Sequence, residues 1–361
     1  MTTSAGRPLP WYIWAPLVVV LGVAVFDFFR ALPPLVSAEL VSFAGPTMGT
    51  RYAISLAHDS QGADWTPDVL EVQRQVDQRL AGINRLMSTY DPNSELSRFN
   101  RYDGKDWFGV SPETAQVVAA ALEIAERSSG AFDPTVGPVV NLWGFGPDKG
   151  RLEPPSDAAV AEALEKVGYL KVSVQMDPPA LKKSLPAVYL DLSGIAKGYA
   201  ADEVGDLLAT LGFSNSMVEI GGEVRTRGRK TDGSPWRIGI EQPDERSRQV
   251  HAAVRLVDAG MATSGDYRNF FEHQGTRYSH TIDPATGRPV RHRTAAVSIV
   301  APTAMEADGL ATAVLVMGDR RGYDWCMEQG VAAMLLVREG DEIVERSTPR
   351  FEKLLERKSQ E

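Results

Sequence analysis

The residues best suited to chemistry in this chain gather in one short stretch. Residues 188–192 predict a strand, and Asp191, Ser193 and Gly194 lead from it into a predicted helix. A helix start offers free backbone N–H groups and a positive dipole end, so it favours an anionic ligand. Lys197, one turn further on, adds a mobile positive charge suited to phosphate. An ordinary capped helix with a solvated lysine would show the same pattern.

A second pair of residues could bind a metal ion. Asp308 and Thr312 are four residues apart on a predicted helix and therefore share one face. A carboxylate and a hydroxyl on one face can both ligate a hard cation such as Mg²⁺, which completes its octahedron with water and substrate phosphates. The alternative is an aspartate in a salt bridge and a threonine bonded to its own helix.

His280 is the strongest candidate for a general base among the five histidines. A neutral histidine near pH 7 can accept a proton from a hydroxyl group. Asp283 lies three residues later and could either orient His280 or cap the turn at Pro284. A histidine whose hydrogen bonds are satisfied at a strand end is the competing interpretation.

The composition is that of an ordinary globular protein. The chain has 361 residues and a net charge of −9, which argues against a nucleic-acid binder because such proteins show basic patches. Cys326 is the single cysteine, so an internal disulfide and a thiolate metal cluster are both excluded. We expect Cys326 to be a small buried apolar residue.

The N-terminus predicts a membrane segment. Residues 9–29 are mostly apolar, with only Asp27 charged, and are just long enough to span a bilayer core of roughly 30 Å. A cleaved signal peptide ending at residues 36–38 is the alternative. Either interpretation sends the rest of the chain across the membrane.

The remaining pattern consists of helices followed by short strands, which favours an α+β fold. Apolar spacing, capping residues and terminal glycines predict helices over 68–87, 111–130, 156–167, 193–211 and 303–317. Alternation predicts strands over 51–57, 217–220, 224–228, 236–241, 253–257, 277–282, 295–300, 332–337 and 342–346. From residue 351 the chain is charged and is expected to fray.

Seven segments in this order carry a resemblance to a known family: residues 45–52, 87–91, 130–138, 188–202, 219–222, 279–289 and 307–313. Together they resemble the ApbE family of FAD:protein FMN transferases. The resemblance implies one compact domain with a mixed or antiparallel sheet and packed helices. We place it at 43–347, after a membrane or signal segment (1–30) and a linker (31–42), and before a charged tail (348–361).

The resemblance also implies a set of site residues. The metal ligands would be Asp308, Thr312 and the backbone carbonyl of Gly194, with Ala311 as a further family position that here has no side-chain oxygen. The FAD site would be lined by Met48, Tyr90, Ala131, Phe132, Asp133, Asp191, Lys197 and Ile282. His280 and Asp283 remain the candidates for proton transfer.

The implied activity is Mg²⁺-dependent transfer of FMN from FAD to a threonine or serine hydroxyl of another protein, with release of AMP. The acceptor would be a membrane redox protein with exported segments, and the catalytic domain would lie on the periplasmic side of the bacterial inner membrane. Two rivals share the site: an FAD pyrophosphatase that uses water as acceptor, and a non-catalytic FAD carrier.

Overall fold

The computed structural model describes residues 35–36, 40–58, 67–147, 153–243, 249–267, 269–340 and 342–356. The predicted membrane segment over residues 9–29 lies outside these residues. Within them, no helix is both long enough and apolar enough to cross a membrane.

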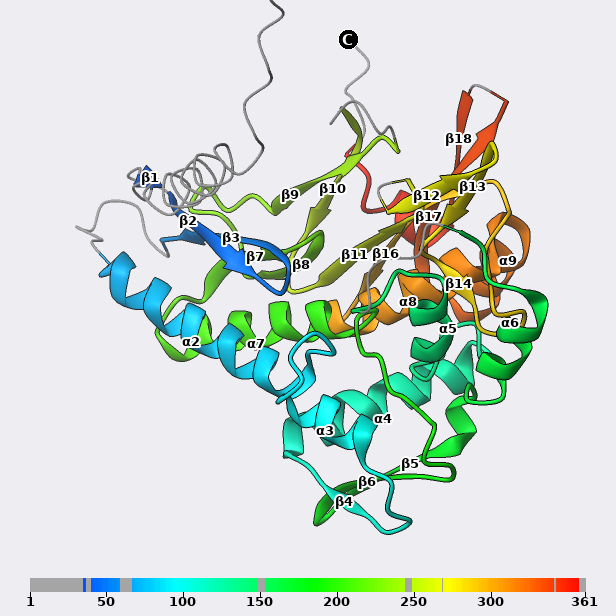
Figure 1. Cartoon of the computed structure of the whole chain (residues 1–361). Coiled ribbons are helices and arrows are strands. Elements are labelled where there is room, and N and C mark those ends of the chain that lie inside the picture. The colour runs from blue at the N-terminus through cyan, green and yellow to red at the C-terminus, as the bar shows by residue number, and fades with distance from the viewer. Residues whose placement is uncertain are drawn as a thin grey trace, which may run out of the picture.

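A large antiparallel sheet forms the centre of the described structure (Figure 1). Its strands are, in spatial order, β1 (Leu35–Val36), β2 (Leu40–Thr47), β3 (Thr50–Ala57), β7 (Asn215–Ile220), β8 (Glu223–Arg227), β11 (Gly260–Gly265), β16 (Thr294–Ala301), β17 (Ala332–Glu339) and β18 (Glu342–Ser347). The α+β prediction is confirmed, because antiparallel pairing joins all of these neighbours.

Helices cover one face of this sheet. Figure 1 shows α2, α7 and α8 in a row beneath it, with α3 and α4 in a further layer. The described helices are α2 (Val69–Met87), α3 (Glu95–Arg101), α4 (Pro112–Arg127), α5 (Gly137–Leu142), α6 (Asp157–Leu164), α7 (Ala196–Thr210), α8 (Ala304–Met317), α9 (Asp319–Gln329) and, on the other side of the sheet, α10 (Pro349–Glu352). The main core lies between these two layers, where apolar faces of the helices meet the sheet.

Smaller strand groups surround this framework. They are β4 (Phe108–Gly109) with β5 (Val172–Met176) and β6 (Pro179–Lys183), β9 (Trp236–Glu241) with β10 (Val250–Leu256), β12 (Phe270–His273) with β13 (Thr276–Ser279), and β14 (Ile282–Asp283) with β15 (Arg288–Pro289). A second core packs β9, β10 and α10 on the other side of the sheet. A third lies around Trp143 and holds Ile282.

Three predictions about elements are wrong. Residues 188–192 form no strand. The side chain of Asn100 donates to the carbonyl of Leu190 and accepts from its amide, both at 2.8 Å, and so takes the place of a partner strand. The helix expected from residue 193 begins at Ala196. The chain does not fray at residue 351, because Phe351 is fully buried and residues up to 356 bond to β10. The rest of the predicted frayed tail, 357–361, lies outside the described residues.

Two further boundaries differ from expectation. The strand expected over 277–282 is divided into β13 and β14, with His280 and Thr281 between them. The helix expected over 156–167 ends at Leu164. The prediction for Cys326 is confirmed, since its side chain is fully buried in the main core.

Candidate active site

One cavity of about 450 Å³ brings together most of the residues singled out in the sequence. Its walls come from the segments after α2 and α4, from α5, from the segment that leads into α7, from the start of β8 and the end of β11, from the loop between β13 and β14, and from one face of α8. The predicted site residues that line it are Tyr90, Ala131, Phe132, Asp133, Asp191, Gly194, Lys197, His280, Ile282, Asp308 and Thr312.

The segment before α7 is held by its own backbone and side chains. The amide of Asp191 donates to the carbonyl of Pro134 at 2.7 Å, which joins this segment to the loop after α4. Asp191 Oδ1 accepts from the amide of Ser193 at 2.9 Å, so the aspartate side chain stabilises the turn. Asp191 also lines the cavity, and its charge therefore faces any ligand bound there.

The start of α7 is capped from another helix. The N-cap residue Ile195 provides no side-chain cap, and Asp308 of α8 supplies one instead, because its Oδ2 accepts from the amide of Gly198 at 3.0 Å. Asp308 is 2% exposed. A buried carboxylate at a helix N-terminus is stabilised by the N–H groups and by the helix dipole. Asp308 therefore contributes both to the fold and to the cavity.

The three predicted metal ligands lie close together. A Cβ placed on Gly194 would come within 3.2 Å of Thr312 Oγ1 and of the Phe132 ring, so the backbone of Gly194 lies close to α8 and leaves little room for a side chain. Thr312 Oγ1 also lies 3.4 Å from Ser264 Oγ of β11. Asp308 is one turn away on the same face of α8. These are hard oxygen donors of the kind that Mg²⁺ prefers.

This donor set fits a magnesium ion that keeps water and substrate oxygens as its other ligands. Within the described ranges, no group of three or more His, Cys, Asp or Glu side chains could hold a metal by itself. The proposed site differs from such a group because it has a single carboxylate, that of Asp308. Its other two donors are the hydroxyl of Thr312 and the backbone carbonyl of Gly194. Ala311 takes no part, since it is fully buried in the main core and does not line the cavity.

Lys197 lies between two buried carboxylates. Its Nζ is 2.5 Å from Glu223 Oε1 and 3.9 Å from Asp308 Oδ1. Burial lowers the pKa of Lys197, but the charges of Asp308 and Glu223 outweigh this effect and hold the pKa above its ordinary value. The ammonium group is thus charged at neutral pH, and it lines the cavity with its side chain 29% exposed.

Glu223 is a site residue that the sequence pattern does not single out. It opens β8, is 3% exposed, and lines the cavity. Burial raises its pKa to about 8, and the nearby charge of Asp308 adds to this rise while Lys197 opposes it. Its Oε2 is buried without a hydrogen-bond partner among the described residues. The sequence feature that could have indicated Glu223 is its position directly after the Gly221-Gly222 motif.

His280 lines the cavity, and one of its two ring nitrogens is held by a hydrogen bond. Its Nδ1 lies 3.0 Å from the carbonyl oxygen of Asn269, and since a carbonyl only accepts, Nδ1 carries the proton. The neutral ring then has a free lone pair on Nε2, as a general base requires. Burial lowers the pKa of His280 below its ordinary value of 6.5, so the neutral form dominates at pH 7.

Asp283 does not orient His280. Its two carboxylate oxygens accept from the amide of Ala285 at 2.9 Å and from the hydroxyl of Thr286 at 3.0 Å. Asp283 is also absent from the residues that line the cavity. Of the two roles left open by the sequence, the structure selects the turn cap, and the carbonyl of Asn269 is the group that orients His280.

The remaining predicted contacts divide into two groups. Tyr90 is 61% exposed at the cavity mouth and offers a flat ring for stacking, whereas Phe132 and Ile282 are buried walls. Asp133 lines the cavity, but its oxygens accept from Thr135 and from the amide of Tyr169, so it fixes the loop.

Met48 lies outside this cavity. It occupies the β2–β3 turn with a φ of 46° and lines a second cavity of about 500 Å³ against α2. Thr50, at the other side of the same turn, does approach the site: a Cβ placed on Gly221 would come within 2.8 Å of its Cγ2. The described structure therefore gives Met48 no contact with the main cavity.

The fold and site together define a class of protein: an α+β protein with a half-buried lysine, hard oxygen donors and an oriented histidine around one cavity. The family model of the ApbE family matches residues 48–335. The chain belongs to the ApbE family, as the motif order indicated.

Individual relatives agree with this assignment. A protein of Vibrio cholerae named FAD:protein FMN transferase is 42% identical over 318 residues, which cover 88% of this chain and 93% of the relative. The structure of the flavin transferase ApbE from Vibrio cholerae matches with a TM-score of 0.80 and 40% identity, covering 88% of this chain and 100% of that one. The apo form of the Pseudomonas stutzeri flavinyl transferase ApbE matches with a TM-score of 0.79 and 38% identity, over 89% of this chain and 98% of the other.

Proposed function

We propose that the protein is an FAD:protein FMN transferase, which moves FMN from FAD to a threonine or serine hydroxyl of another protein and releases AMP. The observation that carries the proposal is the convergence of Lys197, His280 and the Asp308–Thr312 face on one cavity. The names of the curated relatives support it, since relatives that match most of this chain are FAD:protein FMN transferases.

Binding of FAD follows from the cavity's charges and surfaces. Lys197 neutralises part of the pyrophosphate charge, which requires its ammonium to exchange some contact with Glu223 for phosphate oxygen. Tyr90 provides an exposed aromatic face against which a planar ring can stack. Asp191 can accept from a ribose or flavin donor at the mouth of the cavity.

The proton of the acceptor hydroxyl goes to His280 in this proposal. The hydroxyl oxygen forms a bond to the FMN-side phosphorus, and the bond from that phosphorus to the bridging oxygen breaks. AMP leaves with the bridging oxygen. His280 Nε2 takes the proton while Nδ1 stays bonded to Asn269. The nucleophile belongs to the acceptor protein, so the enzyme needs no nucleophilic serine or cysteine.

Magnesium would be held by Asp308, Thr312 and the carbonyl of Gly194. When bound, the ion supplies positive charge next to the pyrophosphate and the departing AMP phosphate. Lys197 contributes charge of the same sign, with its Nζ 3.9 Å from Asp308 Oδ1. Asp308 would then lie next to both positive charges, that of Lys197 and that of the ion.

The two rival activities are separated by product analysis. The full chain is incubated with FAD and Mg²⁺, with and without an exported segment of a membrane redox subunit that carries the acceptor threonine. We expect AMP to appear only with the acceptor present, and no free FMN in either case. Equal release of FMN and AMP without the acceptor would identify a pyrophosphatase, and intact FAD in both reactions would identify a carrier.

We also propose that the N-terminal segment tethers the catalytic domain to the outer face of the bacterial inner membrane. The proposal rests on residues 9–29 of the sequence. A reporter fused after Glu361 should be active only outside the cytoplasm, and the full chain should fractionate with membranes. A cytoplasmic reporter signal would refute the orientation, and a mature N-terminus at Glu39 would select the cleaved signal peptide.

A further inference from the structure

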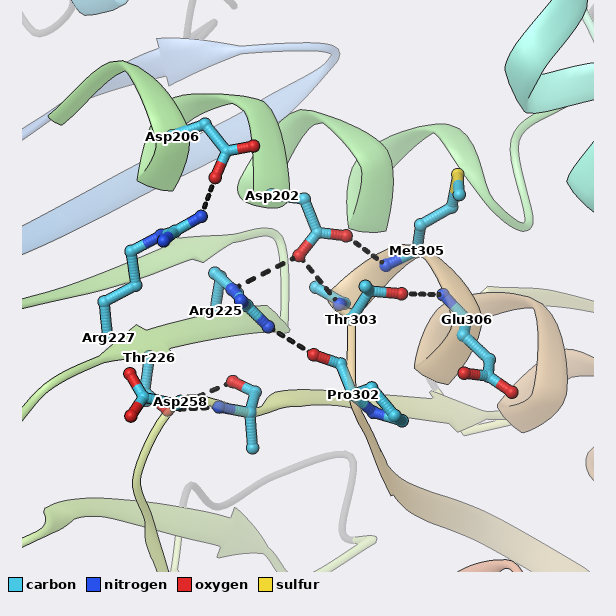
Figure 2. Close-up of polar contacts among 12 residues, drawn as sticks. Asp202, Asp206, Arg225, Thr226, Arg227, Asp258, Pro302, Thr303, Met305 and Glu306 are labelled. Carbon is cyan, nitrogen blue, oxygen red and sulfur yellow. Dashed lines mark hydrogen bonds and ion pairs between the residues drawn. The ribbon is translucent and has the colours of Figure 1, made fainter. Parts of the chain in front are cut away.

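Two aspartates on neighbouring helices cap each other's helix starts. Asp308 of α8 accepts from the amide of Gly198 in the first turn of α7. In return, Asp202 of α7 accepts from the first two amides of α8, at 2.9 Å for Ala304 and 2.8 Å for Met305 (Figure 2). Each helix therefore receives part of its N-terminal hydrogen bonding from the other.

The two helices also approach as closely as backbone permits. A Cβ placed on Gly198 would come within 2.2 Å of the carbonyl oxygen of Ala304 and 2.8 Å of the Cα of Met305. Only glycine fits at this crossing, because any side chain would push the first turn of α8 away. The position of α8 is thus defined by contact as well as by the caps.

Arg225 of β8 fixes this crossing to the sheet. Its Nε lies 3.6 Å from Asp202 Oδ1, and its Nη1 donates to the carbonyl of Pro302, just before α8 (Figure 2). Arg225 and Asp202 have side-chain exposures of 13% and 16%. One guanidinium group therefore connects the aspartate that caps α8 with the backbone that enters α8.

The geometry points to Asp202 as a positioning residue: through the start of α8 it sets Asp308 and Thr312 against Gly194 and Lys197. Asp308 lies four residues after Ala304, about one turn along the helix, so a displaced first turn carries Asp308 with it. The inference rests on the proposed metal site, because it concerns where the metal-binding oxygens stand. Asp202 itself does not line the cavity.

The test measures metal binding directly, without turnover. Binding of Mn²⁺, an oxygen-preferring stand-in for Mg²⁺, is followed by electron paramagnetic resonance on the full chain. In Asp202→Asn one backbone amide of α8 loses its acceptor, and we expect the Mn²⁺ affinity to fall at least tenfold.

A matched control lies one turn further along α7. Asp206 pairs with Arg227 of β8 and, in the described part of the chain, has no hydrogen bond to α8 (Figure 2). Asp206→Asn removes the same charge from the same helix, and we expect its Mn²⁺ affinity to stay within twofold of the unchanged protein. Thermal unfolding of both variants reports general destabilisation separately from metal binding.

The outcomes are distinct. If the unchanged protein binds no Mn²⁺, the metal site of the proposed function fails and the inference fails with it. If it binds Mn²⁺ and Asp202→Asn binds equally well, or if Asp206→Asn loses as much affinity, only the positioning role is refuted. Should Asp202→Asn not fold, Gly198→Ala decides, because it separates the helices without changing a charge and must also weaken Mn²⁺ binding.

Discussion

The ammonium group of Lys197 on α7 lies 2.5 Å from the carboxylate of Glu223 on β8. Glu223 is almost fully buried, and its second oxygen has no hydrogen-bond partner among the described residues. The lysine proposed to bind phosphate is therefore already held in place by an acid before any ligand arrives. Such an arrangement reduces the conformational freedom that Lys197 loses when FAD binds.

Removing the lysine should weaken FAD binding. Lys197→Met deletes a charge-assisted phosphate contact worth about 1.5–3 kcal/mol, so we expect at least a tenfold loss of FAD affinity in a titration followed by flavin fluorescence. Lys182→Met makes the same change at an exposed position of β6 and should leave the affinity unchanged. Equal affinity of Lys197→Met and the unchanged protein would exclude a phosphate contact.

Glu223 should make stability depend on pH in the ligand-free protein. Its pKa rises from 4.5 to about 8 on folding, so the folded state binds more protons than the unfolded state between these values. Its contribution to stability is therefore complete below about pH 4.5 and is lost as the pH rises toward 8. The difference in unfolding free energy between the unchanged protein and Glu223→Gln should decline over this window. A difference that is constant or grows with pH would contradict the assignment.

Two substitutions of Asp308 separate its roles in metal binding and in helix capping. Asparagine keeps an oxygen that can accept from the amide of Gly198, whereas alanine does not. We expect both variants to lose metal-dependent transfer, and Asp308→Ala to be less stable than Asp308→Asn by about 1 kcal/mol, the usual worth of a helix cap. Full transfer activity in Asp308→Asn, or in the unchanged protein with EDTA, would remove Asp308 from the metal site.

His280 should affect the rate of transfer and leave FAD binding nearly unchanged. His280→Ala is expected to lower the transfer rate by about 10²–10⁴-fold, the range of general-base catalysis. Because burial lowers the pKa of His280, the base stays neutral at pH 7, and the rate should fall only on the acidic side of its ordinary value of 6.5. If His280→Ala loses FAD affinity in proportion to its rate, His280 is a binding or structural residue. The same conclusion follows if the fall of the rate at acidic pH persists in His280→Ala.

Much of the fold could be predicted where local pattern decides the structure. The apolar spacing of 68–87 predicts the buried face of α2, and every residue of that stripe is buried. The capping box at Thr303 is also visible in sequence, and its hydroxyl accepts from the amide of Glu306. β11 was missed because its sequence, Gly260–Gly265, has no strand pattern; pairing with β8 and β16 makes it a strand.

Most members of the candidate site could be predicted from the sequence, with Glu223 missed and Met48 wrongly included, but the contacts between them could not. The four-residue spacing of Asp308 and Thr312 shows that they share a face, but not that Asp308 caps a helix that lies 110 residues earlier in the chain. The partners of Lys197 and Asp202 come from β8 and α8, far away in the sequence. Such contacts depend on the tertiary arrangement, which residue spacing alone does not contain.

The most direct test of the proposed function is the intact mass of an acceptor protein. An exported segment of a membrane redox subunit is incubated with the full chain, FAD and Mg²⁺, alongside the same segment with its acceptor threonine changed to alanine. The proposed function predicts that only the threonine form gains the mass of FMN less one water, with one AMP released for each flavin attached. An unchanged acceptor mass while FAD is consumed, or attachment to the alanine form, would contradict it.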